Sequence, residues 1–435
     1  MLATASARAR PTGAVVLIAG ASLLVGYLAI THPPVAMLLA ATPALLFLIA
    51  RPSWAAALGV SLVPVLHSLV GSEGGSVVVS PSDAVFLLTA IGIFPLLLLV
   101  PEWHARLPAM RTLFLFSLPW LAWLLVILAA HSSVHSAFKT MTAIEVTLFP
   151  VLIGACVLDK ERARWALYGY LASAGALAIL WIGGGSSSFA GNKNAAGQHL
   201  ALAVLLTIVL ARGRLRGYAV VPLFVVGMLF ASSRGAIVGL AFGIIALLAL
   251  RGLGSWRRTA LATVALSAIV LIGYNAVPVN VQARVQAIFT ASNRVTGVGS
   301  AIEQSTAYNL SIRKAFRDDA LRIVSENPIL GVGTGNYHAG TGPTISIDPH
   351  NVFLRTAAEG GIPDTAAFVF MIGGTALLLV RRLGRNPWAG AAIAIQVATL
   401  THATVDVYFT RGIPVLSWLL VGMALNPKLD STEKQ

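Results

Sequence analysis

The chain has 435 residues, of which 57% are hydrophobic and 11% are charged, and its mean hydropathy is +0.82. Because average soluble domains are roughly 45–50% apolar and 25% charged, this composition excludes a soluble fold, a disordered chain, a coiled coil and a secreted disulfide scaffold. It predicts an all-α polytopic membrane protein, so the net charge of +14 has to be interpreted against membrane topology before nucleic-acid binding is considered.

The first apolar stretch, residues 13–31, follows two arginines as a secretory signal would. It is longer than the apolar part of a typical signal, and no small-residue cleavage pattern follows it, so we expect it to be a membrane span. In chain order, spans are predicted near residues 13–31, 35–50, 54–70, 84–101, 113–130, 140–157, 165–182, 197–211, 218–232, 236–250, 259–276, 365–380, 388–405 and 413–425. The short spans 236–250 and 413–425 are also compatible with half-helices, which gives a range of 12 to 14 crossings.

The positive charges predict the orientation of these spans. With the N-terminus inside, 19 of the 30 Lys and Arg residues fall on the cytoplasmic side, and seven of the remaining 11 lie in one long outer loop. Long loops are exempt from the positive-inside rule. The short outer loops then carry four cations, which are Lys139, Lys193, Arg234 and Arg411. This topology predicts that both termini are cytoplasmic.

Residues 276–364 form the long outer loop, and 89 residues are too many for a connector without structure of its own. An amphipathic helix is predicted near residues 281–289, and a second from about Glu303 to Ser325, which Asn327 and Pro328 end. The second helix has an apolar side and a basic side that includes Arg313, and the basic side is either a solvated surface or one that faces phosphate. Its apolar side consists of Ile312, Phe316, Ile323 and Val324.

The chain therefore divides into four parts. Residues 1–275 form an N-terminal transmembrane bundle of about 11 spans, 276–364 a periplasmic or extracellular catalytic loop, 365–425 the C-terminal transmembrane helices and 426–435 a cytoplasmic tail. Within the loop, a glycine-dense stretch at 331–342 is able to cradle phosphate through its amides. It lacks the Gly-Lys-Ser/Thr ending of a P-loop, so a nucleotide site is not predicted.

The stretch that starts with Pro349, His350 and Asn351 and reaches Glu359 directly precedes the span at 365. It places a histidine, an amide and a carboxylate at the mouth of a membrane bundle. In this arrangement the chain resembles the O-antigen ligase and polymerase family of integral-membrane glycosyltransferases. Members carry a His-Asn pair, nine residues and a glycine before a late transmembrane helix, as His350-Asn351 and Gly361 do here. The family pattern then has Gly, Thr or Tyr where this chain has Asp364.

Other stretches extend the resemblance over the C-terminal two thirds of the chain. Residues 327–337 resemble the family's Pro-Leu-Leu-Gly-Val-Gly stretch, 232–235 its short outer turn with an arginine, and 191–194 an earlier outer motif with an asparagine. His402 and Asp406 resemble a polar patch on the penultimate span. The resemblance implies transfer of a glycan from an undecaprenyl diphosphate carrier to a hydroxyl outside the membrane. It also implies an all-helical bundle of the lipid-donor glycosyltransferase (GT-C) type in the cytoplasmic membrane of a bacterium, without a metal or nucleotide.

In that chemistry an alcohol attacks the anomeric carbon and loses its proton. Since histidine titrates near neutral pH, we predict that His350 is the general base, oriented by Asn351 or Glu359. The alternative is a loop histidine that caps a helix. No Asp-x-Asp, HExxH or cysteine ligand set is present, so no metal and no cofactor are expected.

The lipid diphosphate leaves with negative charge, which cations at the membrane surface stabilise. Arg234 and Lys193 are the first candidates for diphosphate binding, and Arg313 and Arg355 follow them. Arg234 and Lys193 are also compatible with snorkelling to lipid headgroups. His402, Asp406 and His338 are expected to line the donor cleft, whereas Glu145, if it pairs with Lys139, is structural.

The expected partners are an undecaprenyl diphosphate-linked glycan, a glycan or glycolipid acceptor and the bilayer, with no nucleic acid. Two family functions stay open, namely ligation to an acceptor such as lipopolysaccharide core and polymerisation of repeat units for O-antigen, capsule or exopolysaccharide. A secondary transporter with Glu145, His402 and Asp406 as an ion relay is the alternative from another class. A channel or receptor explains the long loop but not the cations on short outer turns.

Overall fold

The computed structural model describes residues 33–66, 79–101, 107–184, 192–211, 215–251, 301–337, 348–406, 408–409 and 412–430. The predicted spans 13–31 and 259–276, the predicted helix at 281–289, His338 and Arg411 lie outside these residues. The described chain is built from helices: α2 (Pro33–Ala50), α3 (Pro52–Leu62), α4 (Pro81–Leu99), α6 (Pro108–Ala130), α7 (Val134–Leu152) with the π-helical turn η1 (Ile153–Val157), α8 (Lys160–Ile182), α10 (Lys193–Ala211), η2 (Leu215–Tyr218), α11 (Val221–Ala231), α12 (Arg234–Arg251), α15 (Ala301–Glu326), α16 (Val352–Arg382), α17 (Ala389–Ala403), α18 (Val415–Leu425) and η4 (Pro427–Leu429).

Six of the described helices are long and apolar enough to cross a membrane. Four shorter apolar helices coincide with the predicted spans 218–232, 236–250, 388–405 and 413–425. The predicted all-α polytopic fold is therefore confirmed. The predicted pair of spans at 35–50 and 54–70 differs: the two helices meet at an angle of 110°, and the second ends at Leu62. Pro52 causes the break, because it has no N–H to continue the first helix.

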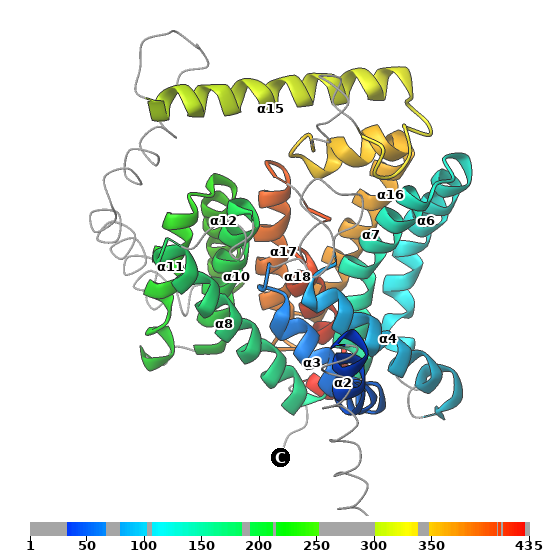
Figure 1. The fold of residues 1–435 in the computed structure, drawn as a ribbon, viewed down its shortest axis with the longest axis vertical. Helices are drawn as coiled ribbons and strands as arrows, with labels where there is room; N and C mark the ends of the chain where they lie inside the picture. Colours follow the sequence, from blue (N-terminus) through cyan, green and yellow to red (C-terminus); the bar gives the residue numbers. More distant parts are fainter. Residues whose placement is uncertain are drawn as a thin grey trace, which may run out of the picture.

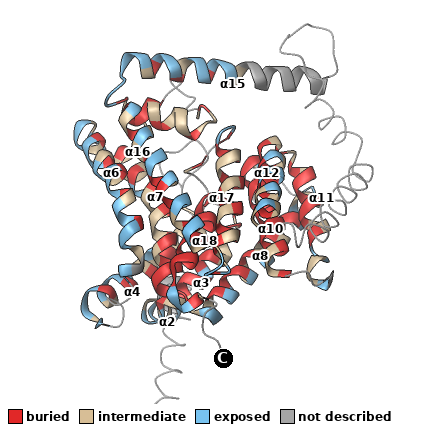
Figure 2. Ribbon diagram, turned by 180° about the vertical axis from the view of Figure 1, so that it is seen from behind, coloured by how far each residue is buried: buried red, intermediate tan, exposed pale blue. Residues whose placement is uncertain are grey.

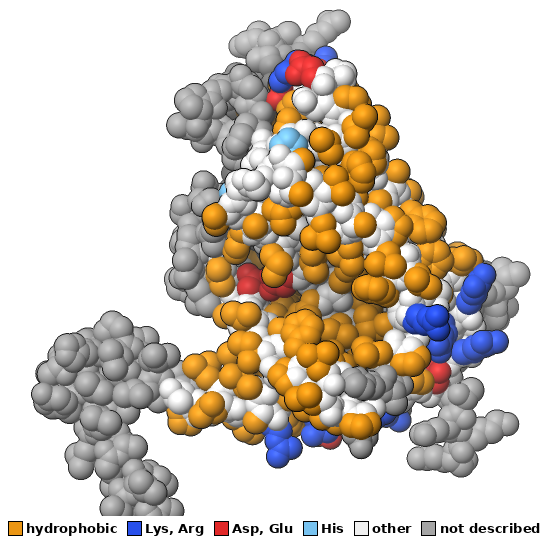
Figure 3. All heavy atoms as spheres, turned by 90° about the vertical axis from the view of Figure 1, so that its right-hand side faces the viewer, with side chains coloured by type: hydrophobic (Ala, Val, Ile, Leu, Met, Phe, Trp, Pro, Cys, Tyr) orange, Lys and Arg blue, Asp and Glu red, His pale blue; other side chains and the backbone are white. Residues whose placement is uncertain are grey.

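The outer surface of the bundle is apolar, as contact with lipid requires. Figure 3 shows a broad hydrophobic region, with Lys and Arg gathered toward its lower part and, together with Asp and Glu, at its top. Leu87 and Leu99 on α4 and Leu125 on α6 are among the large side chains that stay more than half exposed. In contrast, α10 and α18 are buried along most of their length (Figure 2). The core lies around these two helices.

Small residues allow α12 and α17 to approach closely. Gly235, Gly239 and Gly243 recur every four residues on α12, and a methyl group on Gly239 would lie 2.7 Å from the carbonyl oxygen of Ala398. This is the small-xxx-small packing of membrane helices. It places Arg234, the first residue of α12, beside the end of α17 where Thr404 and the residues after it leave the bundle.

Helix α15 lies across one end of the bundle, opposite the end near which α2 and α3 lie (Figure 1). Its predicted apolar side is confirmed, because Phe316 and Ile323 are buried in a cluster with Tyr337 and Ala358. The Tyr337 hydroxyl donates to the Phe316 carbonyl oxygen at 2.7 Å. Burial raises the pKa of Tyr337, which keeps this donor protonated. The cluster fixes α15 on the first turns of α16.

Helix α16 is broken at Gly361, whose φ of 79° and ψ of 176° are not helical. The break frees three carbonyl groups, and each finds a donor. Val332 N donates to Ala358 O at 3.0 Å, Gly333 N donates to Glu359 O at 2.8 Å, and the Trp123 indole donates to Gly360 O at 2.7 Å. The glycine-dense loop therefore completes the backbone hydrogen bonding of the broken helix. The predicted span at 365 is the part of α16 after the break.

Gly361→Ala is expected to lower the thermal unfolding temperature of the protein by several degrees or more. A methyl group at this position would lie 1.9 Å from the carbonyl oxygen of Ile329, and these backbone angles alone cost a non-glycine residue about 1–3 kcal/mol. Gly373→Ala on the same helix is the matched control, since a methyl group there has no neighbour within 4 Å. Equal unfolding temperatures for the two variants in the same detergent would contradict this account of the break.

Candidate active site at the outer end of the bundle

His350 stands directly before α16, in a turn held from both sides. Asn351 caps α16 by accepting a hydrogen bond from Leu354 N at 3.0 Å, and its amide donates to the Thr404 carbonyl oxygen at 3.0 Å. Asp348 accepts from the backbone N–H of His350 at 2.8 Å. His350 has a φ of 54°, a left-handed conformation that side chains other than Gly, Asn and Asp rarely adopt. The turn therefore holds the imidazole in place at a cost in backbone strain.

The His350 ring contacts the carboxylate of Asp406, which follows the end of α17. Its Nδ1 lies 3.3 Å from Oδ1 of Asp406, whose side chain is 3% exposed. Asn351 and Glu359, the orienting partners expected from the sequence, make other contacts, and the described side chain in contact with the ring is that of Asp406. With Nδ1–H donated to the carboxylate, the Nε2 atom carries the lone pair that accepts a proton.

The second oxygen of Asp406 faces a cation from the outer loop. Arg313 Nη2 on α15 lies 3.6 Å from Asp406 Oδ2, and its Nη1 donates to the Val405 carbonyl oxygen at 3.0 Å. Arg234 lies close enough for its charge to be repelled by that of Arg313. The structure thus brings together His350, Asp406, Arg313 and Arg234 from four separate segments of the chain.

His402 lies behind this group, one turn before Asp406. It is fully buried, neither ring nitrogen has a hydrogen-bond partner among the described residues, and its charge would interact with Asp406, Arg313 and His350. Gly235 makes room for it, since a methyl group there would lie 2.9 Å from the His402 ring. His402 and Asp406 were expected on one helix face and in the donor cleft, but α17 ends at Ala403, before Asp406, and both side chains are buried.

Arg355 differs from its expected role in diphosphate binding. Its guanidinium bonds to Asp348 at 2.5 Å and to Glu359 at 3.1 Å, and its side chain is only 16% exposed. Two carboxylates therefore neutralise the cation that a diphosphate would need. Glu359, expected beside His350, is held in the same ion pairs. These contacts tie the His350 turn to the helix break.

The ion pair considered between Lys139 and Glu145 is not observed among the described residues. The Lys139 side chain interacts electrostatically with Arg355 and Glu359, whereas the Glu145 side chain interacts electrostatically with Asp83 on α4. Gly335 packs directly on the Lys139 side chain. Lys193, the first residue of α10, is exposed. The first turn of α10 meets the start of α12, because Gly197 packs against Ser233.

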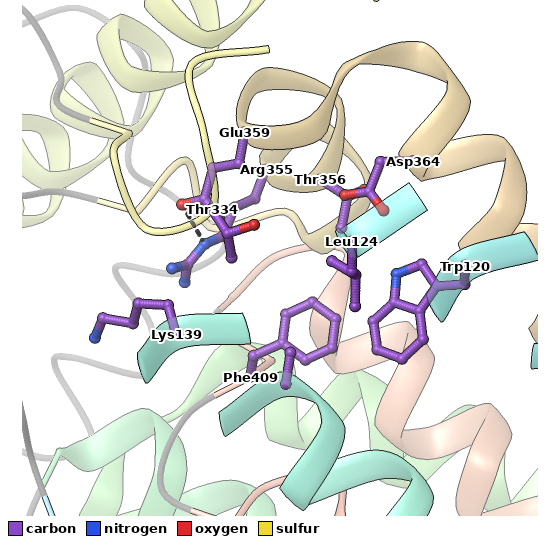
Figure 4. Close-up of a pocket in the computed structure, with 10 residues that line it drawn as sticks. Trp120, Leu124, Lys139, Thr334, Arg355, Thr356, Glu359, Asp364 and Phe409 are labelled. Atoms are coloured by element: carbon purple, nitrogen blue, oxygen red, sulfur yellow. Dashed lines mark hydrogen bonds and ion pairs between the residues drawn. The ribbon is translucent and has the colours of Figure 1, made fainter. Parts of the chain in front are cut away.

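A pocket opens beside the ion pairs, between α6, α7 and α16 (Figure 4). Lys139, Arg355 and Glu359 lie at one end, and Trp120 and Asp364 lie at the other, with the Phe409 ring between them. Phe409 follows Asp406 by three residues, so one short segment contributes to both the pocket and the His350 contact. The pocket is lined by Trp120, Leu124, Lys139, Ala143, Thr334, Arg355, Thr356, Glu359, Asp364 and Phe409.

Residues 219–369 match the family model described as O-antigen ligase. This region is an O-antigen ligase-like domain. No curated protein is similar enough to the chain to count as a match. The resemblance predicted from the sequence is confirmed, and the family implies a multi-pass membrane glycosyltransferase or ligase-type enzyme acting on lipid-linked glycans.

The O-antigen ligase-like domain contains His350, Arg313 and Arg234, but the carboxylate that contacts His350 lies outside the matched residues, at Asp406. Sequence reasoning did not find Asp348 or the pairing of His350 with Asp406. The polar pair at 402 and 406 on an apolar span was the available signal for Asp406. Asp348 gave no signal beyond its closeness to His350 in the sequence.

Proposed function

We propose that the protein transfers a glycan from an undecaprenyl diphosphate carrier to an acceptor hydroxyl on the outer face of the cytoplasmic membrane. The O-antigen ligase-like domain supports the glycosyltransferase class. The contact between His350 and Asp406, at the end of the bundle that α15 covers, is the observation that carries the assignment of the site. In this proposal both termini are cytoplasmic.

His350 accepts the acceptor's hydroxyl proton at Nε2 while the oxygen attacks the anomeric carbon. Asp406 fixes the ring orientation and tautomer through Nδ1 and offsets the positive charge that the ring acquires. The bond between the anomeric carbon and the diphosphate oxygen breaks, and its electron pair leaves with the diphosphate. Positioning the base in a rigid turn lowers the entropic cost of this step.

Arg313 and Arg234 bind the departing diphosphate. Their mutual repulsion in the absence of an anion favours a ligand that carries more than one negative charge. Arg313 contributes although it contacts Asp406, since that side chain is 36% exposed and its closest distance to the carboxylate is 3.6 Å. Lys193, exposed at the start of α10, supplies a further cation.

Deleting the gene and analysing the lipid-linked glycans of the cell tests this function. We expect undecaprenyl diphosphate-linked glycan to accumulate and the full-length chain to restore its consumption. Long chains left on the carrier assign a ligase, and single unpolymerised units assign a repeat-unit polymerase. An unchanged pool of lipid-linked glycan, with normal surface polysaccharide, would refute the proposal.

A further inference from the structure

Ile329, Leu330 and Ile362 form an apolar corner where the segment that follows α15 meets the break of α16. Ile329 is 63% exposed, Ile362 is 56% exposed, and Leu330 is exposed as well. Ile362 N donates to the Pro328 carbonyl oxygen at 2.8 Å, and Gly361 packs on the carbonyl group of Ile329. The backbone therefore holds the two segments of the apolar corner together.

The apolar corner continues the lipid-facing side of α16. Large apolar side chains that are about half exposed recur along this helix at Ile362, Val369, Leu377 and Val380. Their spacing of seven, eight and three residues places them on one side of the helix. From Ile362 to Val380 the helix rises by about 27 Å, which is close to the roughly 30 Å of a hydrocarbon core. Since Arg381 follows directly at one end, Ile362 lies at the opposite boundary of that core.

Helix α6 supports the same boundary. The Trp123 indole donates to the Gly360 carbonyl oxygen at 2.7 Å, and tryptophan is enriched at the level of the lipid headgroups because its ring is apolar and its N–H is polar. Leu125, two residues later, is still more than half exposed. In Figure 3, which views the side of the molecule where α6 lies, the hydrophobic surface reaches up toward the charged side chains at the top.

The charges of α15 stop before the apolar corner. Arg322 pairs with Asp319 at 2.6 Å and with Glu326 at 2.7 Å in the last turns of the helix, and no charged residue follows up to position 337. Single exposed apolar side chains are ordinary on a protein surface. Here they lie together, next to paired charges and at the end of a lipid-facing stripe, as a segment at the boundary of water and lipid does.

We infer that the apolar corner inserts into the outer leaflet of the bilayer and holds the C-terminal end of α15 at the membrane surface. This contact goes beyond the proposed glycan transfer and does not depend on it. Helix α15 is then attached at two places, through the apolar corner to lipid and through Arg313 to the Val405 carbonyl oxygen at 3.0 Å. The lipid contact thereby sets the height of Arg313 above the membrane.

Fluorescence quenching on the full-length protein in nanodiscs tests the inference without requiring transfer. The chain has one cysteine, Cys156, which is buried. Ile329→Cys therefore directs an NBD fluorophore to the apolar corner, and the unchanged chain treated with the same reagent supplies the blank. Phospholipids with a nitroxide on the acyl chain are expected to quench this fluorophore, and iodide in the water is expected to reach it poorly.

Leu321→Cys is the matched control. Leu321 is 52% exposed on α15, but it shares the side of the helix that carries exposed Lys314 and Asp318, away from buried Phe316. A fluorophore there should show the opposite result, with iodide quenching severalfold stronger than at position 329 and little quenching by lipid. Equal iodide quenching at the two positions would overturn the inference. A fluorophore at position 329 that is shielded from both quenchers would also overturn it, because protein then covers the apolar corner.

Amide hydrogen exchange tests whether the apolar corner holds α15. Ile329→Asp should speed exchange in the last turns of α15 by about tenfold, a factor within reach of losing the burial of one isoleucine side chain in lipid. Leu321→Asp should change it by no more than about twofold, as an exposed position without such a contact. Exchange in Ile329→Asp that is no faster than in Leu321→Asp would overturn the role of the apolar corner in holding the helix.

Discussion

His350→Asn is expected to lower the rate of glycan transfer by about 10²–10⁴-fold, the usual contribution of a general base. Asparagine is the informative substitution because it adopts the left-handed backbone conformation of position 350 more readily than histidine does. The variant should therefore fold and insert normally while it lacks a proton acceptor. Initial rates with purified protein and lipid-linked donor measure the effect, and thermal unfolding in the same detergent verifies the fold.

His131→Asn is a suitable control for this substitution. His131 follows α6 and packs against Gly333 at the same end of the molecule, outside the contacts of Asp406. It should leave transfer within a factor of about two, as expected for a position without a catalytic role. If His350→Asn retains wild-type transfer, the assignment of the base is wrong, and His402 on α17 becomes the next candidate.

The sequence predicted the parts of this fold that depend on local pattern. Hydropathy identified the helices, and the apolar side of α15 was predicted because its buried residues recur at helical spacing. The break of α16 was not predicted, since the sequence shows a glycine and a proline at 361 and 363 but not the loop that supplies donors to the broken helix. The bend between α2 and α3 was missed, because hydropathy does not report the direction of a helix.

The site was predictable as a set of residue types but not as a set of pairs. His350 and Arg313 were selected from their positions in the outer loop, whereas their shared contact with Asp406 spans 56 and 93 positions in the sequence. Arg355 was assigned to diphosphate because the sequence gives no sign that Asp348 and Glu359 neutralise it. Asp364 stands where the family pattern has Gly, Thr or Tyr, and in the structure it lines the pocket between α6, α7 and α16.

Asp406→Asn is expected to lower kcat by about 10²–10⁴-fold with little change in either KM. The amide keeps the size of the side chain, but it can donate to Nδ1 and so favour the tautomer in which Nε2 carries the proton and no longer accepts one; in catalytic triads the equivalent change costs about 10⁴ in kcat. Asp406 contacts both His350 and Arg313, so it has two possible roles, orienting the base and positioning the arginine. Arg313→Gln separates them, because it removes a cation proposed to bind the donor while Asp406 still contacts His350. It should mainly raise KM for the donor. If Asp406→Asn instead raises the donor KM as Arg313→Gln does and leaves kcat unchanged, the carboxylate serves to position Arg313, and the orientation of His350 must come from the strained turn and its contact with Asp348 alone.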